Sequence, residues 1–398
     1  MNQTIYDAVI IGGGPSGATA ATDLALAGHS VLLIERGGRI KPCGGAIPPR
    51  LLADFDIPQH LLVAKARSAR MIAPSGRAVD MPVGEIGYVG LVDREEFDEW
   101  LRERARHSGA ERLTATFEKI ERDDNAHPIV TFRRSRGGPI ESVRARVVIG
   151  ADGARSAVAK QCLPGAERIP CVFAYHEIIK SPERDSEHFD ASRCDVYYQG
   201  RLSPDFYAWV FPHGDTASIG VGSANKGFSL RGAIATMRDD LGLERCQTVR
   251  REGAPIPLKP LKRWDNGADV IVAGDAAGIV APASGEGIYY AMVGGRVVAD
   301  AASAFLKTGE AKQLRTARKR FMKEHGTVFW VLGMMQYFWY SSDKRRERFV
   351  TMCDDKDVQE LTWQAYMHKK LVRAKPMAHI KIFIKDTAHL LGLRAATR

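Results

Sequence analysis

The fold is decided by residues 7–17, which read Asp-Ala-Val-Ile-Ile-Gly-Gly-Gly-Pro-Ser-Gly. The apolar start of this stretch predicts a buried parallel strand, and Gly12, Gly14 and Gly17 follow it in the spacing Gly-x-Gly-x-x-Gly. A helical pattern comes next, and a second apolar run then ends at Glu35. Strand, glycine turn, helix and second strand in this order predict a βαβ unit that binds a dinucleotide.

The residues of this turn have distinct expected tasks. Gly12, Gly14, Ser16 and Gly17 are predicted to line the pyrophosphate, because glycines permit the tight turn and the helix N-terminus attracts an anion. Glu35 is placed to accept hydrogen bonds from a ribose hydroxyl. A carboxylate there favours an unphosphorylated ribose, so we expect FAD or NAD at this site rather than NADP.

Two later segments each place an aspartate directly after a buried strand. Asp152 stands in residues 150–153, Gly-Ala-Asp-Gly, and Asp275 follows Gly274. Either segment alone could be a turn that an Asp side chain caps. Together with residues 7–35 they resemble three fingerprints of the FAD-dependent para-hydroxybenzoate-hydroxylase-like superfamily. The resemblance implies that Asp152, Gly274 and Asp275 lie beside FAD.

Arg94, Gly285 and Gly287 complete the expected cofactor site. The resemblance implies that Arg94, at a helix start, approaches the cofactor phosphates, and a solvated arginine is the alternative. Gly285 and Gly287 lack Cβ atoms, which suits close approach of the backbone to a flavin ring. An ordinary turn before a helix is the alternative for these two glycines.

Three further segments, residues 41–48, 174–177 and 204–212, resemble those of geranylgeranyl reductases. The last fits the pattern Pro-x-x-Tyr-x-Trp-x-Phe-Pro, and the chain is similar over nearly its whole length to the bacterial members that serve (bacterio)chlorophyll biosynthesis. The resemblance implies an FAD-dependent enzyme, with NADPH as hydride donor, that saturates a geranylgeranyl chain to phytyl. Geranylgeranyl diphosphate and the chlorophyllide ester both remain open as the substrate.

The residues predicted to bind the prenyl chain lie in the last of these segments. Tyr207, Trp209 and Phe211 alternate along one face of a strand, as the wall of a long apolar slot would. Ordinary core residues are the alternative interpretation.

Two residues are predicted to act in proton transfer. Cys43 is the first candidate for proton delivery to the alkene or for positioning the flavin ring, because its loop is expected to face the flavin. His176, together with Glu177, is a second candidate that could relay a proton. An inert buried thiol and a hydrogen-bonded core histidine are the alternatives.

The predicted fold is α/β, with a Rossmann-like FAD-binding domain, an interleaved substrate domain of mainly antiparallel β-sheet and a helical C-terminal region. The FAD-binding domain is predicted at residues 1–165 and 263–310, and the substrate domain at residues 166–262. The helical, basic C-terminal region is expected at residues 311–398.

The positive charge of the chain is concentrated in its last quarter. The 398 residues include 57 Lys and Arg against 47 Asp and Glu, yet residues 301–398 alone hold 20 basic and 9 acidic residues. These cations flank an aromatic-rich helical stretch that contains Phe329, Trp330, Leu332, Met335, Phe338 and Trp339. A basic aromatic helix predicts contact with an anionic membrane surface, and packing on the protein's own core is the alternative. Nucleic acid is disfavoured because no binding motif accompanies the charge.

The sequence also narrows the location and the class of protein. No signal peptide and no segment long enough to span a bilayer is evident. Together with the basic aromatic helix, the family resemblance implies a peripheral protein on the cytoplasmic side of the bacterial inner, photosynthetic membrane. The six cysteines form no Cys-x-x-Cys pair, which argues against a metal site. Two other functions remain open: a flavin hydroxylase of the same fold, and a non-enzymatic carrier of prenyl lipids.

Overall fold

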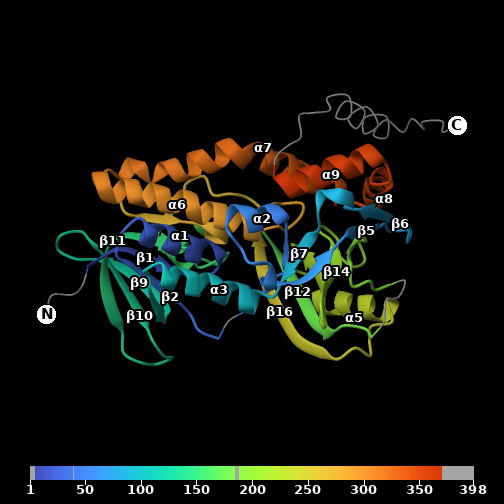
Figure 1. Ribbon diagram of the computed structural model, residues 1–398, viewed down its shortest axis with the longest axis horizontal. Helices are drawn as coiled ribbons and strands as arrows, with labels where there is room; N and C mark the ends of the chain where they lie inside the picture. The colour runs from blue at the N-terminus through green and yellow to red at the C-terminus, as the bar shows by residue number, and fades with distance from the viewer. Residues whose placement is uncertain (1–4, 39, 184–187, 370–398) are drawn as a thin grey trace. The chain divides into compact units, whose positions relative to one another are not determined.

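The computed structural model describes residues 5–38, 40–183 and 188–369 (Figure 1). The chain divides into two compact units, and each of them is made of three separate stretches of sequence. Unit 1 comprises residues 1–43, 93–173 and 254–333, and unit 2 comprises residues 44–92, 174–253 and 334–398. The expected interleaving of two folding units is therefore a property of the structure.

Unit 1 is built on a seven-stranded sheet in the order β8-β2-β1-β11-β10-β9, with β17 paired to β11. The strands that pair in parallel are β1 Ile5–Ile11, β2 Val31–Glu35, β8 Glu111–Thr114, β11 Glu141–Gly150 and β17 Val270–Val272. The antiparallel strands are β9 Thr116–Arg122 and β10 Pro128–Arg133. Central strands such as β2 are buried on both faces, which explains their continuous apolar runs.

The helices of unit 1 begin where the sequence signals predict. Pro15 occupies the first turn of α1 Pro15–Leu26, where its missing N–H costs nothing. Asp93 caps α3 Arg94–His107 by accepting a hydrogen bond from the backbone N–H of Glu95. α1 packs against α3 and against α6 Ile288–Thr308. The shorter α4 Ala157–Cys162 follows β11.

Unit 2 contains a second seven-stranded sheet in the order β16-β12-β15-β14-β13-β5-β6. Its strands are β5 Ser68–Ile72, β6 Ala78–Pro82, β12 Cys171–Lys180, β13 Arg193–Tyr197, β14 Ala208–His213, β15 Thr216–Ser223 and β16 Thr248–Pro257. A small sheet adds β3 Ala46–Ile47, β4 Leu62–Ala66 and β7 Val89–Val92. The helices are α2 Pro49–Asp54, α5 Leu230–Asp240, α8 Asp343–Met352 and α9 Lys356–His368.

The core of unit 2 lies between its large sheet and α5. Val210 from β14 and Ile219 from β15 are buried against Ile234 and Met237 of α5. Because side chains alternate along a strand, the odd-numbered residues of β14 face the opposite side of the sheet. That opposite face carries the predicted prenyl-chain residues.

The boundaries of the units differ from the predicted domain boundaries by 8 and 9 residues at the ends of the stretch 174–253, and by more than that in two other places. Residues 44–92 belong to unit 2, because β5 pairs in parallel with β13 and β3, β4 and β7 form a sheet of their own. The mixed polar and apolar pattern of these short strands gave no indication of this pairing. Residues 311–398 are not one separate region either, since α7 Arg315–Trp339 begins in unit 1 and α8 and α9 belong to unit 2. Residues 370–398 of this predicted region lie outside the described residues.

The aromatic residues of α7 divide between core and surface. In unit 1, Phe321 and Phe329 pack on Tyr290 of α6, with ring centroids 6.3 and 5.0 Å away. Trp330 is 63% exposed on the same helix, and Tyr337 is 85% exposed. The alternative of core packing therefore holds for Phe329, and contact of the exposed residues with a membrane remains a prediction. No helix in the described part of the chain is long and apolar enough to cross a bilayer.

Candidate active site

The glycine turn after β1 is closed so tightly that side chains are excluded from it. Gly12 has φ +104°, and a Cβ atom there would lie 2.3 Å from the backbone oxygen of Ala151. A Cβ atom at Gly17 would lie 1.8 Å from the backbone oxygen of Gly12. These two glycines bring the start of α1 against β1 and against the segment that follows β11.

The N-terminus of α1 combines free space with unused hydrogen-bonding capacity. No atom lies within 4 Å of the position that a Cβ atom of Gly14 would occupy. Gly14 is the N-cap residue and gives the helix no side-chain cap. The Ser16 hydroxyl is buried, and among the described residues its oxygen has no hydrogen-bond partner. Such a helix start, with open N–H groups and an unpaired hydroxyl, fits an anionic pyrophosphate.

Glu35 ends β2 beside this turn. Its carboxylate accepts a hydrogen bond from the backbone N–H of Gly13, and burial raises its pKa. The Nη1 atom of Arg102 on α3 is 3.3 Å from the backbone oxygen of Gly13, which it approaches as a donor. Glu35 is therefore held at the end of the strand, as a residue that binds a ribose must be.

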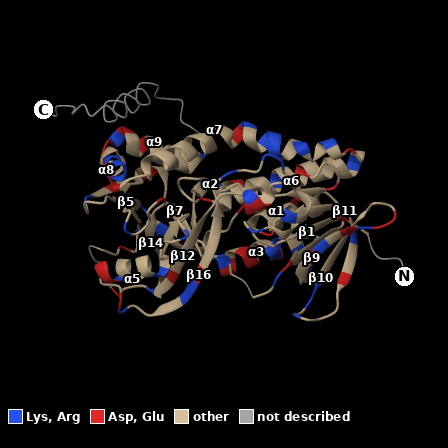
Figure 2. Ribbon diagram, turned by 180° about the vertical axis from the view of Figure 1, so that it is seen from behind, with Lys and Arg blue, Asp and Glu red and all other residues tan. Residues whose placement is uncertain are grey.

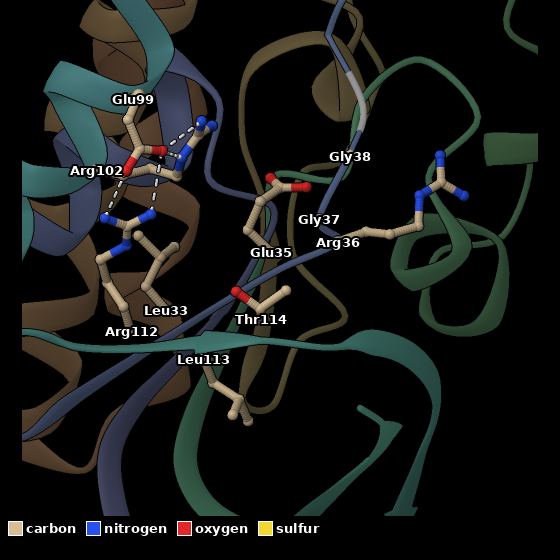
Figure 3. Close-up of a pocket in the computed structure, with 10 residues that line it drawn as sticks. All are labelled: Leu33, Glu35, Arg36, Gly37, Gly38, Glu99, Arg102, Arg112, Leu113 and Thr114. Atoms are coloured by element: carbon tan, nitrogen blue, oxygen red, sulfur yellow. Dashed lines mark hydrogen bonds and ion pairs between the residues drawn. The ribbon is translucent and has the colours of Figure 1, made fainter. Parts of the chain in front are cut away.

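A pocket of about 150 Å³ opens next to Glu35 (Figure 3). Its polar wall includes Arg102 and Arg112, which both pair with Glu99 at 2.8 and 2.9 Å. The complete lining is Leu33, Glu35, Arg36, Gly37, Gly38, Glu99, Arg102, Arg112, Leu113 and Thr114. A polar pocket at this strand end fits the adenosine half of a dinucleotide.

The Gly274-Asp275 segment lies against the same helix start. A Cβ atom at Gly274 would be 2.8 Å from the Cβ atom of Ser16, and one at Gly287 would be 3.7 Å from the Asp275 carboxylate. Asp275 is buried and forms an ion pair with Lys41. The structure thus gathers Ser16, Gly274, Asp275 and Gly287 in one place. Gly285, with φ +64°, directly precedes this part of the turn.

Lys41 is a site residue that no sequence motif indicated. It belongs to the segment 41–48 that carried the family resemblance, but only Cys43 was singled out there. Lys41 and Asp275 are separated by more than 200 positions in the chain, so no local sequence pattern links this cation to its buried carboxylate. Only the fold brings Lys41 to Asp275.

The Asp152 side chain caps a helix. Its carboxylate accepts hydrogen bonds from the Ser156 hydroxyl at 2.5 Å and from the backbone N–H of Ala157 at 2.6 Å, at the start of α4. Burial raises the pKa of Asp152. The side chain thus has the capping role that was the alternative interpretation, and a contact of this segment with the cofactor remains a prediction.

Arg94 is buried and is not a solvated arginine. It pairs with Asp98, one turn further along α3, at 2.7 Å, and it also hydrogen-bonds to the Cys43 thiol. Burial by itself lowers the pKa of Arg94, but Asp98 and Cys43 outweigh it and raise the pKa. Cys43 is half-buried, so a fixed cation lies beside a partly accessible thiol.

The odd-numbered aromatic residues near β14 form a row of rings in unit 2. The ring centroids of Tyr207 and Trp209 are 5.9 Å apart, and those of Trp209 and Phe211 are 6.2 Å apart. A Cβ atom at Gly44 would be 3.0 Å from the Phe211 ring, and one at Gly220 would be 1.9 Å from the Trp209 ring. These glycines let the backbone approach the row, which we call the aromatic wall.

His176 and Glu177 point to opposite faces of β12. Both ring nitrogens of His176 are engaged, Nδ1 with Ser218 and Nε2 with Glu252, each at 3.0 Å. Glu177 pairs with Arg238 at 2.6 Å and with Arg251 at 3.0 Å. The sequence did not indicate these partners, which come from three other elements of unit 2.

The comparisons with known proteins agree with this geometry. Residues 7–190 and 226–384 match the sequence family described as lycopene cyclase protein. The chain is 59% identical over 388 residues to the geranylgeranyl diphosphate reductase of Rhodobacter capsulatus, a match that covers 98% of both chains. The chain belongs to the geranylgeranyl reductase family. It is also 35% identical to the Synechocystis geranylgeranyl diphosphate reductase, over 96% of this chain and 97% of that one.

Solved structures extend the likeness beyond this reductase family. A geranylgeranyl bacteriochlorophyll reductase-like protein from Thermoplasma acidophilum superposes with a TM-score of 0.80 over 94% of this chain and 99% of that one, at 21% identity. A flavin-dependent brominase superposes with a TM-score of 0.73 over 96% and 100% of the two chains, at 18% identity. These likenesses confirm the predicted fold class, which the reductases share with other flavin-dependent enzymes.

Proposed function

We propose that the chain is an FAD-dependent reductase that saturates double bonds of a geranylgeranyl chain. The observation that carries this proposal is the 59% identity to a geranylgeranyl diphosphate reductase over 98% of both chains. The glycine turn, the Ser16 hydroxyl and the pocket at Glu35 support it, because together they offer space and donors for a dinucleotide. Once a reductant has reduced it, an FAD held by these residues would supply a hydride for one alkene carbon.

In this proposal unit 1 holds FAD. The backbone N–H groups at the start of α1 and the Ser16 hydroxyl bind the pyrophosphate, and Glu35 binds the adenosine ribose. Asp275, fixed by Lys41, approaches the ribityl and pyrophosphate region. The backbone at Gly285 and Gly287 leaves room for the flavin ring.

The second hydrogen must reach the alkene as a proton. We assign this step to the Cys43 thiol, which gives its proton to the carbon that does not receive hydride. The Arg94 guanidinium next to it stabilises the thiolate that remains. One hydride and one proton complete the saturation. Because an isolated alkene has no carbonyl to stabilise the developing charge, the site must also exclude water.

A Cys43→Ala variant tests this assignment. We expect alkene reduction to fall by at least about 100-fold while the flavin content stays unchanged, the size of effect expected for a general acid. Cys43→Ser has a hydroxyl in place of the thiol, which can still donate a proton, so this variant should be more active than Cys43→Ala. Full activity of Cys43→Ala would remove Cys43 from the mechanism.

The prenyl chain is proposed to lie along the aromatic wall in unit 2. Tyr207 and Trp209 are 8% and 6% exposed, so bulk water scarcely reaches these apolar rings, as saturation of an isolated alkene requires. Both geranylgeranyl diphosphate and its chlorophyllide ester carry this chain, and the headgroup remains to be tested.

NADPH is proposed as the reductant. One Gly-x-Gly-x-x-Gly motif follows a strand, and the pocket at Glu35 is assigned to FAD, so NADPH would bind only transiently. Anaerobic mixing of the yellow enzyme with NADPH, NADH or reduced ferredoxin should bleach the flavin absorbance fastest with NADPH. Faster bleaching by reduced ferredoxin would mean that ferredoxin, and not NADPH, is the reductant.

The exposed face of α7 is proposed to meet an anionic membrane surface on the cytoplasmic side of the bacterial inner, photosynthetic membrane. Trp330, Met334 and Tyr337 are 63%, 47% and 85% exposed at helical spacing, so they lie on one face of the helix. Figure 2 shows Lys and Arg along the first half of α7. Removing the whole helix would expose the core around Phe329, so point variants are the better test.

Flotation with vesicles that contain phosphatidylglycerol tests this location. The double variant Trp330→Ser, Tyr337→Ser should float at least about fivefold less than the native chain, because it loses most of the exposed apolar area. Equal flotation of both proteins would refute the assignment.

Mass spectrometry of the products tests the overall function. Supplied with NADPH and either substrate, the enzyme should add two hydrogen atoms for each reduced double bond. Addition of oxygen would instead indicate a hydroxylase, and an isomer of unchanged mass would indicate a cyclase. A colourless protein that binds the lipid without converting it would be a carrier.

A further inference from the structure

Four side chains from four neighbouring strands form a continuous hydrogen-bonded chain that ends at the aromatic wall. The Trp209 indole Nε1 is 3.1 Å from the Ser218 hydroxyl, which is 3.0 Å from His176 Nδ1. His176 Nε2 is in turn 3.0 Å from Glu252. Ser218, His176 and Trp209 are 0%, 3% and 6% exposed, so water does not compete for these bonds.

With a neutral His176 imidazole, the chemistry of the groups gives every hydrogen bond in this chain one direction. An indole N–H only donates, so the Ser218 oxygen accepts from Trp209. A carboxylate only accepts, so His176 donates its Nε2–H to Glu252. The other ring nitrogen of a neutral imidazole is an acceptor, and it therefore takes the Ser218 hydroxyl hydrogen. Arg250, 2.6 Å from the second oxygen of Glu252, keeps the carboxylate in place.

The Trp209 ring is also confined on its other side. Trp209 and Gly220 are cross-strand partners of β14 and β15, and a Cβ atom at Gly220 would lie 1.9 Å from the ring. The indole therefore lies flat over a residue that has no side chain. Steric confinement and the hydrogen bond to Ser218 together leave this ring a single orientation.

We propose that Ser218, His176 and Glu252 are positioning residues that fix the orientation of Trp209 and thereby determine how many double bonds of the prenyl chain are reduced. This inference rests on the proposed function, because it takes the aromatic wall as the surface along which the chain slides. A wall residue that rotates changes the apolar surface that the chain meets in unit 2, and with it which double bonds of the bound chain can be reduced.

The arrangement gives His176 a role other than the predicted proton relay. Both of its nitrogens are already committed, and its partners are Ser218 and Glu252. A protonated ring would direct a second N–H at the Ser218 oxygen, whose own hydrogen would then lose its acceptor. What the site needs from His176 is an acceptor at the Nδ1 position.

Two isosteric variants separate these roles. The amide of His176→Asn reaches the position of Nδ1 and can still accept from Ser218, whereas the amide of His176→Gln reaches the position of Nε2. Neither variant can act as an imidazole acid or base. A proton relay would be lost equally in both, while positioning should survive in His176→Asn and fail in His176→Gln.

The orientation of Trp209 can be measured without substrate. In FAD-loaded enzyme labelled with ¹⁵N at the tryptophan indoles, the resonance that is missing from Trp209→Phe belongs to Trp209. We expect exchange of its N–H with solvent to be accelerated about tenfold in His176→Gln and in Ser218→Ala, as loss of one buried hydrogen bond implies, and to stay near native in His176→Asn.

The product pattern then tests the consequence for specificity. With saturating FAD and NADPH, His176→Gln and Ser218→Ala should release at least about threefold more partly reduced chains, and His176→Asn should keep the native ratio. Equal behaviour of the two His176 variants, or an unchanged Trp209 resonance in Ser218→Ala, would overturn the inference. If no variant or native enzyme reduces the chain but the resonances shift as expected, the positioning network stands and the proposed function fails. Ser218→Ala decides the matter if the His176 variants do not fold.

Discussion

The candidate site of unit 1 is formed mainly by backbone atoms, whereas that of unit 2 is formed by side chains. In unit 1 the turn around Gly12 and Gly17 is shaped by backbone atoms that approach closer than any side chain would allow. In unit 2 the aromatic wall is held by side chains, through the chain from Trp209 to Glu252. At Gly12 and Gly17 the backbone leaves no room for an added atom, whereas the site made of side chains can be altered one hydrogen bond at a time.

The largest effect is expected at the backbone-built site. Gly17→Ala places a Cβ atom 1.8 Å from the Gly12 oxygen, so we expect a loss of at least about 3 kcal/mol in the free energy of unfolding and no bound flavin. Gly14→Ala is the matched control, because its Cβ atom meets no protein atom within 4 Å. It should unfold within about 0.5 kcal/mol of the native apoprotein, yet lose flavin affinity.

Calorimetry of the apoproteins and flavin fluorescence titration separate the two outcomes. Tight flavin binding by Gly14→Ala would mean that the open space at the helix start does not hold the pyrophosphate. Native stability of Gly17→Ala would mean that the turn can widen to accept a Cβ atom 1.8 Å from the Gly12 oxygen.

The next largest effect is expected at Gly220. Gly220→Ala drives a Cβ atom into the Trp209 ring, so the ring must move, at a cost of about 2–3 kcal/mol in stability. The flavin should remain bound because the clash lies in unit 2, while reduction of the prenyl chain should fall. The exposed Gly227→Ala should leave both properties native. Loss of flavin from Gly220→Ala, but not from Gly227→Ala, would contradict the assignment of flavin binding to unit 1 and prenyl-chain binding to unit 2.

The sequence predicted the backbone-built site better than the side-chain-built one. The glycine turn, Glu35 and Gly274-Asp275 lie in short motifs, and the residues of each motif determine its local conformation. In the structure these motifs lie close together. The alternation of Tyr207, Trp209 and Phe211 was also visible from strand periodicity. Ser218 and Glu252 were not, because they lie 9 and 43 positions beyond Trp209 and reach it only through strand pairing.

A smaller effect with a defined pH dependence is expected at Glu177. Burial raises its pKa, but hydrogen bonds from Arg251 and Arg238 outweigh burial and lower the pKa below the usual 4.5. The carboxylate therefore stabilises the fold above that pH, and its contribution is lost as the pH falls through the lowered value. Glu177→Gln should cost about 2 kcal/mol at pH 7 and progressively less below about pH 4.5.

Denaturant unfolding of native and variant chains from pH 7 to pH 3 measures this difference. The exposed Glu244→Gln should change stability by less than about 0.5 kcal/mol across that range. A Glu177→Gln deficit that stays constant down to pH 3 would mean that the ion pairs with Arg238 and Arg251 are not its source.

Two serine variants compared side by side test the central claim, that cofactor binding and prenyl-chain positioning reside in separate units. Ser16→Ala removes an oxygen that has no partner among the described residues, and Ser218→Ala removes the link between Trp209 and His176. The measurement is the dissociation constant of FAD together with the product ratio at saturating FAD. The account predicts that Ser16→Ala weakens FAD binding about 5–10-fold with a native product ratio, and that Ser218→Ala does the reverse. A Ser218→Ala variant with weakened FAD binding and a native product ratio would contradict it.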